Sequence, residues 1–65
     1  MDELNYLIKQ NVVGDTSSTY KAVITTLKNN VAINSLITWI KTKSVSRCLS
    51  SEEVLNMAQA LKCRH

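Results

Sequence analysis

Apolar residues recur along this chain at intervals of three and four, the spacing that places side chains on one face of an α-helix. The densest such stretch is 31–43. By the helical period its apolar face spans roughly 160° of the circumference, so it needs neighbours on more than one side. We therefore expect this segment to form the centre of the core. Its stripe consists of Ile33, Leu36, Ile37 and Ile40, with Ala32 and Trp39 beside them.

The same spacing predicts a first helix over about residues 3 to 12, which Asp2 can cap at its N-terminus. Leu4, Leu7 and Ile8 form its predicted inner face, whereas Tyr6 points away. The segment 14–18 then breaks the pattern, because Gly14 tolerates a left-handed backbone and the hydroxyl side chains after it can cap a helix.

A second helix is predicted over about residues 19 to 29. Five apolar residues are in phase on its inner face, and this outweighs the low helix propensity of its Thr and Val residues. These five are Tyr20, Val23, Ile24, Leu27 and Val31.

The apolar stripe changes phase between Val31 and Ile33, where Asn residues gather. Asn caps helices and tolerates turn conformations, so we expect a turn at 29–34. The alternative is one long helix over about residues 18 to 43 with two apolar faces, which would require an intertwined oligomer.

A last helix is predicted over about residues 51 to 62. Ser50 and Glu53 match the S-x-x-E capping box, the sharpest local signal in the chain, and Leu49 anchors the polar connector before them. The predicted inward residues are Val54, Met57, Ala58 and Leu61, with Leu55 to one flank.

These segments indicate an all-α fold: one domain over residues 1–65, built as a bundle of about four short helices, alone or as a dimer. One Gly and no Pro argue against linkers and turn-rich β folds. No run approaches the roughly 20 apolar residues of a membrane span, and the acidic start is unlike a signal peptide. We expect a cytoplasmic chain in which Cys48 and Cys63 stay reduced, because a straight last helix holds them about 20 Å apart.

The charges follow the predicted helices, with acids near their starts and lysines near their ends, as the helix dipole favours. The middle of the chain, 16–51, nevertheless contains basic residues and no acid until Glu52. If they share a surface, they would attract phosphate or an acidic protein. The candidates for contacts with nucleic acid or an acidic partner are Lys41, Lys43, Arg47 and Arg64.

Catalytic chemistry is not indicated, so we expect neither an enzyme nor a small-molecule substrate. The single His65 is the last residue, where a terminus cannot hold a base in place. Cys63, His65 and Cys48 fall short of the usual four zinc ligands, and the chain lacks a Gly-rich phosphate loop. We expect no metal and no cofactor.

A chain of 65 residues buries only about 60% of the surface that its unfolded form exposes. The apolar helical surface here exceeds what so short a chain can enclose, which predicts a regulatory interaction protein that binds a partner protein or itself. Trp39 is the expected anchor, since Trp is enriched at interface hot spots. The predicted contact residues are Leu36, Trp39, Ile40, Tyr6 and Leu55.

The alternative function is DNA binding. The segment 20–40 resembles a helix-turn-helix, with apolar Val23, Ile24 and Leu27, a turn, and then Ile37 and Ile40. Residues 51–61 are similar to the last helix of phage-repressor-like domains. Three departures oppose this resemblance. The 29–34 connection is about two residues too long, and Ile24 stands where a small residue is usual. The would-be recognition helix is also too apolar to face base edges.

Overall fold

The computed structural model describes residues 3–63 and contains four helices and one short pair of strands. The predicted all-α bundle of four short helices is therefore confirmed. Its elements in chain order are α1 (Glu3–Asn11), β1 (Val12–Val13), α2 (Thr16–Thr26), α3 (Asn30–Lys43), β2 (Leu49–Ser50) and α4 (Ser51–Cys63).

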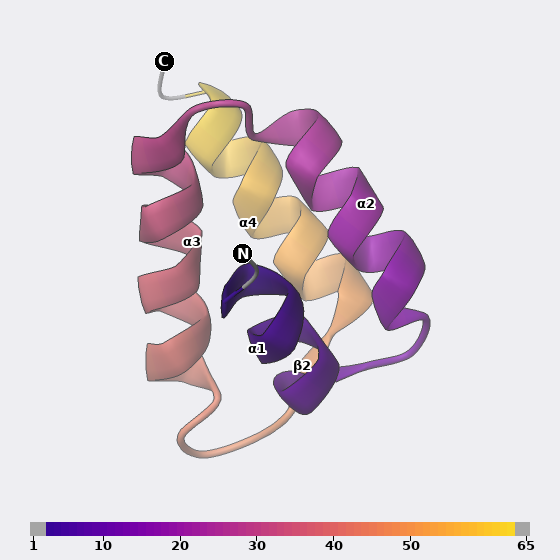
Figure 1. The fold of residues 1–65 in the computed structure, drawn as a ribbon. Helices are drawn as coiled ribbons and strands as arrows, with labels where there is room; N and C mark the ends of the chain where they lie inside the picture. Colours follow the sequence, from indigo (N-terminus) through magenta and orange to yellow (C-terminus); the bar gives the residue numbers. More distant parts are fainter. Residues whose placement is uncertain (1–2, 64–65) are drawn as a thin grey trace.

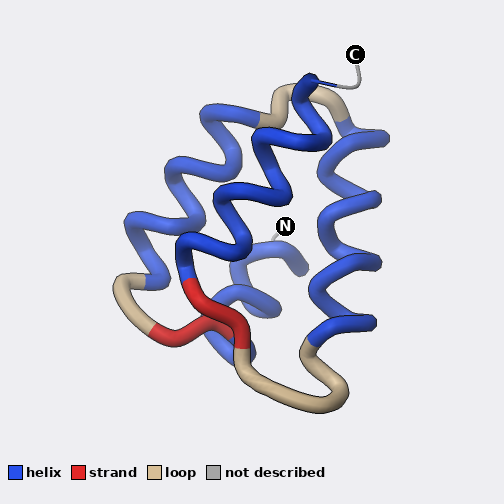
Figure 2. The backbone as a smooth tube through the Cα atoms, turned by 180° about the vertical axis from the view of Figure 1, so that it is seen from behind, coloured by secondary structure: helices blue, strands red, loops and turns tan. Residues whose placement is uncertain are grey.

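The helices form a ring in which consecutive helices are not always neighbours. Figure 1 shows α1 in front and α4 behind, with α2 and α3 on either side. Each of α2 and α3 packs against both α1 and α4. Helices α2 and α3 therefore lie diagonally across the bundle although a loop of only three residues joins them, and Figure 2 shows the same arrangement from behind.

Two β-branched residues, Val12 and Val13, end the first helix by taking extended backbone. They pair in parallel with β2, in the register Val12 with Leu49 and Val13 with Ser50. Parallel pairing makes the segments that follow the two strands leave in the same direction. As a result α2 and α4, which begin just after β1 and β2, run side by side with the same polarity.

Gly14 has φ of +115°, which confirms the predicted break. The helix that follows starts earlier than predicted, at Thr16 rather than about residue 19. The reason is its cap: the carboxylate of Asp15, not a Ser or Thr hydroxyl, accepts a hydrogen bond from the Ser18 amide at 3.1 Å. Asp2, the predicted cap of α1, lies outside the described residues.

The turn between α2 and α3 is real but shorter and earlier than predicted, at 27–29. Leu27 has extended backbone and closes α2 by donating its amide hydrogen to Val23. Asn29 then caps α3, since its side-chain oxygen accepts from the Val31 amide at 2.7 Å. Val31 therefore belongs to α3, where it is exposed, and the alternative of one long helix is wrong.

The capping box at the start of α4 is confirmed. The Glu53 amide donates to the Ser50 hydroxyl at 3.1 Å, and the Ser50 amide donates to the Glu53 carboxylate at 3.4 Å. Leu49, predicted as an anchor, is 1% exposed.

Aliphatic side chains from every element fill the core. Two details differ from the sequence pattern: Ile24 lies at the edge of the core with 40% of its surface exposed, and Thr19 is buried instead. The buried apolar residues are Leu4, Ile8, Val12, Val23, Leu27, Ala32, Leu36, Ile40, Leu49, Val54, Ala58 and Leu61.

Candidate interaction surfaces

The residues expected to contact a partner do not form one surface. Leu36 and Ile40 are 0% exposed, because α3 turns them toward the centre of the ring, and a buried side chain cannot contact a partner of the folded chain. Trp39 is half-buried and packs against the core. The prediction that Leu36 and Ile40 form a contact surface is therefore wrong, because the other three helices cover them.

Tyr6 and Leu55 belong to different helices and differ in exposure. Tyr6, on α1, is 63% exposed, as its place opposite the inner stripe predicts. Leu55, on α4, is half-buried and packs against the core. Figure 1 shows α1 in front of the ring and α4 behind it, so the two residues come from helices on different sides of the bundle.

Acidic side chains pair with two of the four basic residues expected to form a cluster around the end of α3. The ammonium of Lys41 lies 2.7 Å from the Glu3 carboxylate. Arg47 forms a bidentate ion pair with Glu53, in which Nη1 and Oε1 lie 2.9 Å apart. These pairs reduce the attraction for phosphate that Lys41 and Arg47 would otherwise provide, whereas Lys43 is exposed and has no ion pair in the described part of the chain. Arg64 lies outside the described residues.

The same ion pair changes the acidity of both partners. The hydrogen bond from Arg47, assisted by the backbone amide of Ser50 and by the charges of Arg47 and Lys43, lowers the pKa of Glu53 from 4.5 to about 2. The carboxylate of Glu53 in turn raises the pKa of Arg47. Glu53 thus joins the connector to α4 in two ways, as the ion-pair partner of Arg47 and as half of the capping box.

The arrangement of α2 and α3 departs from that of a helix-turn-helix. The three-residue connection has a suitable length, so the objection to its length no longer holds. The outer side of α3 is also more polar than its stripe suggested, with Asn34, Ser35 and Thr38 exposed. However, a helix-turn-helix packs its two helices directly on one another, whereas α2 and α3 lie across the core from each other (Figure 1).

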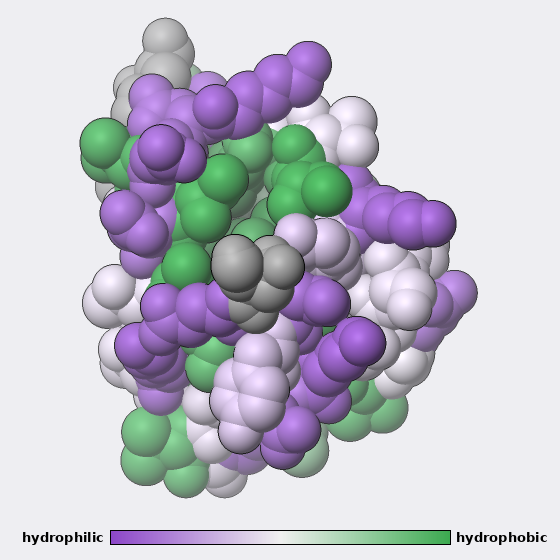
Figure 3. All heavy atoms as spheres, viewed as in Figure 1, coloured by the Kyte–Doolittle hydropathy of each residue, from purple (hydrophilic) through white to green (hydrophobic). Residues whose placement is uncertain are grey.

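A groove lies between α2 and α3, and the first residues of α1 border it. We call this cavity of about 450 Å³ the α2–α3 groove. In Figure 3 hydrophobic atoms gather on this face between α3 and α2, above α1. The groove is lined by Glu3, Leu4, Tyr20, Ile24, Ile33, Asn34 and Ile37.

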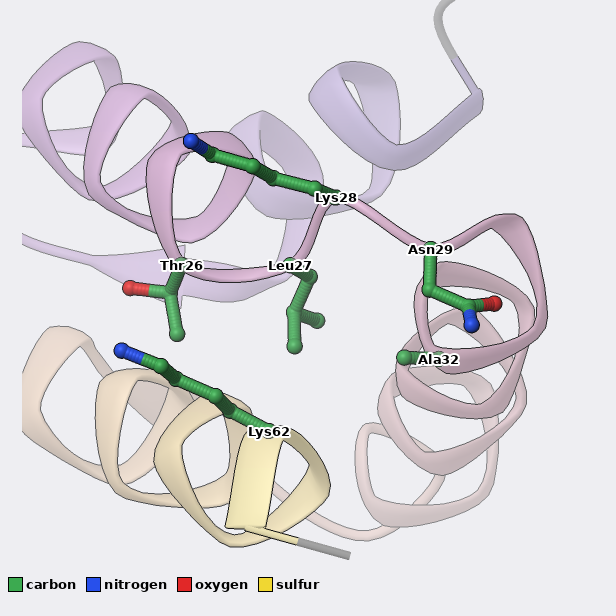
Figure 4. A pocket seen from close by; sticks show the side chains of 6 residues that line it. All are labelled: Thr26, Leu27, Lys28, Asn29, Ala32 and Lys62. Carbon is green, nitrogen blue, oxygen red and sulfur yellow. The ribbon is translucent and has the colours of Figure 1, made fainter. Parts of the chain in front are cut away.

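A second cavity, of about 270 Å³, lies where α2 ends, α3 begins and α4 ends, and we call it the end pocket. Buried Leu27 and Ala32 form its apolar floor. Figure 4 shows the side chains of Lys28 and Lys62 extending along opposite sides of Leu27, both toward the Thr26 side. The pocket thus combines an apolar interior with two cations at its rim. Its lining residues are Thr26, Leu27, Lys28, Asn29, Ala32 and Lys62.

Among residues 3–63, no three His, Cys, Asp or Glu side chains lie close enough to hold a metal ion. The cysteines Cys48 and Cys63 are exposed and unbridged, as predicted. Nor does this part of the chain contain a helix with both the length and the apolar character of a membrane span. His65 lies outside the described residues.

Comparisons with protein-family models, curated proteins and solved structures found no match to this chain.

Neither cavity was predicted from the sequence, although some of the residues that line them stand out in the sequence pattern. The lysines of the end pocket stand in helix-ending positions, which the charge pattern explained by the helix dipole alone. Ile24, Ile33 and Ile37 were assigned to the core, because their spacing matches the inner stripes. Only the diagonal placement of the helices leaves these side chains at the edge of a groove.

Proposed function

We propose that this protein acts by binding another protein, with the α2–α3 groove as the contact site. The observation that carries this proposal is the groove itself, a cavity of mixed polar and apolar lining in which Ile24, Ile33 and Ile37 are only partly covered. Apolar side chains grouped in a hollow and bordered by polar residues are typical of protein-binding sites.

The fold also indicates the kind of partner that would fit. Helix α1 packs between α2 and α3, so this space already accepts a helix. One or two turns of an amphipathic helix from a partner, in line with α1, would repeat that packing and cover Ile24, Ile33 and Ile37. The polar side chains of Glu3 and Asn34 would border such a contact.

This site replaces the earlier assignment to Leu36, Trp39 and Ile40. Helix α3 still supplies three of the seven lining residues, but through the side that carries Ile33 and Ile37 and not through the buried stripe. DNA binding has less support, because Lys41 and Arg47 are engaged with Glu3 and Glu53.

Site-specific photo-crosslinking in the cells that make this protein tests the proposal. A photoreactive residue at position 24, at the rim of the groove, should give an adduct of discrete mass. The matched control places the same residue at position 45, which is 85% exposed on a loop. We expect no adduct of that mass from position 45.

Competition completes the test. Added wild-type protein should suppress the adduct from position 24, whereas an Ile24→Glu variant of equal helix content should not, because a charge at the rim opposes apolar docking. An adduct with the mass of two copies would identify the partner as the chain itself. Absence of an adduct at position 24, or equal labelling at position 45, would refute the groove as the contact site.

A further inference from the structure

The two helices that form the walls of the α2–α3 groove contain no acidic residue. Helix α2, helix α3 and the residues that join them contain lysines but neither Asp nor Glu. A surface with this composition attracts negative charge. The lysines of these segments are Lys21, Lys28, Lys41 and Lys43.

Two of these lysines belong to the α2 side of the groove. Lys21 is exposed and stands three residues before Ile24, so their side chains are neighbours on the surface of α2. Lys28 follows the end of α2, and Figure 4 shows its side chain running back along α2 on the side of Leu27 toward α1, whereas Lys62 lies on the other side. Neither Lys21 nor Lys28 has an ion pair within residues 3–63. The apolar edge of α2 is therefore accompanied by two ammonium groups.

The acids of the described chain do not offset this charge. Glu3 lines the groove, but its carboxylate lies 2.7 Å from the Lys41 ammonium, so the pair adds no net charge. Asp15 caps the start of α2, about 13 Å along the helix axis from Ile24. The other described acids are in the first turn of α4, which contributes no residue to the lining. The surroundings of the groove are thus positive.

A second copy of this chain offers no helix that suits such a groove. The apolar faces of all four helices are already turned into the core of their own chain. Only α4 contains more acids than bases, and only by one. The charges around the groove therefore favour another protein as its occupant.

We propose that the α2–α3 groove binds an acidic amphipathic helix of another protein, a proposal that rests on the groove being the contact site. The apolar side chains of that helix cover Ile24, Ile33 and Ile37, while its Asp and Glu residues face Lys21 and Lys28. A hollow of about 450 Å³ fits the convex side of a helix, whereas a flat lipid surface does not enter it. Exposed charges at a rim act mainly on the association rate and on the choice of partner. The groove therefore prefers acidic helices to basic helices with the same apolar face.

Two synthetic peptides with one shared apolar face test this preference. Both are about 14 residues long, with blocked ends and leucines at helical spacing, and the leucines are flanked by Glu in one peptide and by Lys in the other. Methyl resonances of Ile24, Ile33 and Ile37 report binding at the groove in titrations up to about 1 mM peptide, because contacts this small are weak. At low salt the Glu peptide should bind about fivefold more tightly than the Lys peptide. At about 0.5 M salt this difference should shrink.

Charge reversal gives the decisive result. Lys21→Glu should weaken binding of the Glu peptide about fivefold and strengthen binding of the Lys peptide, because it exchanges attraction and repulsion at the rim. Tighter binding of the Lys peptide also shows that the variant is folded. The matched control, Lys62→Glu, makes the same charge change on α4, which does not line the groove, and should keep the wild-type preference.

Failure of this proposal is distinguishable from failure of the groove. Equal binding of both peptides at the isoleucines, or equal effects of Lys21→Glu and Lys62→Glu, would overturn the acidic partner and leave the groove as a contact site. If neither peptide moved these resonances, the acidic partner would also be refuted, and the photo-crosslink from position 24 would decide the groove separately. Shifts caused by raising the protein concentration alone would assign the groove to a second copy. Shifts caused only by phosphatidylglycerol vesicles would assign it to a membrane surface, and either result would overturn the proposal.

Discussion

The hydroxyl oxygens of Thr19 and Ser51 lie 2.8 Å apart and join the starts of α2 and α4, although 32 positions separate the two residues in the chain. Thr19 is 3% exposed, and its hydroxyl also lies 2.8 Å from the Asp15 carbonyl oxygen. Ser51 in turn donates to the carbonyl of Val13. These contacts join the N-terminal ends of α2 and α4 and stabilise the parallel pairing of the two helices.

The Thr19–Ser51 contact leads to the first prediction. Thr19→Val keeps the shape of the side chain but removes its hydroxyl, so the free energy of unfolding should fall by about 1–2 kcal/mol. Urea denaturation followed by circular dichroism measures this change. Thr25→Val is the control, because the Thr25 hydroxyl is exposed and bonds only the Lys21 carbonyl of its own helix. A control loss as large as that of Thr19→Val would contradict the role of the contact between α2 and α4.

Gly14→Ala should destabilise the fold by about 1–2 kcal/mol, since a Cβ atom is unfavourable at positive φ. The backbone there has φ of +115°, and an added Cβ would lie 3.1 Å from the Ser51 hydroxyl oxygen. Thermal unfolding should show a lower midpoint for this variant. Ser17→Ala, at an exposed position in α2, should change the midpoint little. An unchanged midpoint for Gly14→Ala would mean that the turn adapts without strain.

Stability should depend on pH through Glu53. Its pKa is lower in the folded chain, about 2, than the ordinary value of 4.5, because Arg47 binds the carboxylate form. The ion pair therefore stabilises the folded state fully above pH 4.5, and this stabilisation is lost as the pH falls from 4.5 to about 2. Denaturation of wild type and Glu53→Gln across this range should show a stability difference that shrinks with acidification. In an Arg47→Gln background most of that pH dependence should vanish, and its persistence would assign the shift to another group.

Apolar spacing and capping residues were sufficient to predict the helices and some of the residues at which they begin or end. The spacing of Leu4 and Ile8, and of Val54, Ala58 and Leu61, predicted which residues of α1 and α4 are buried. The Ser50–Glu53 capping box was readable because both partners lie within one helical turn. The residue that caps the N-terminus of α2 was harder to predict. Asp15 and several Ser and Thr residues nearby can all cap a helix, and the sequence alone does not show which of them does so. The start of α2 was therefore placed about three residues too late.

The candidate sites were mostly beyond sequence reasoning, because each depends on contacts between distant segments. Leu36 and Ile40 were expected at an interface, yet the other helices enclose them. Lys41 and Arg47 suggested a cationic surface until the fold brought Glu3 and Glu53 to them. The exposed aromatic Tyr6 was predicted correctly because a helix with one apolar stripe has a defined outer side.

Periodicity, capping and composition thus determined that the chain forms four short amphipathic helices, because these are interactions among residues within a turn or two of each other. The tertiary structure alone decided that α2 and α4 run parallel and that α2 and α3 lie diagonally, because the Val12–Leu49 pairing joins segments far apart in the chain. That long-range pairing places the N-termini of α2 and α4 at one end of the bundle and their C-termini at the other.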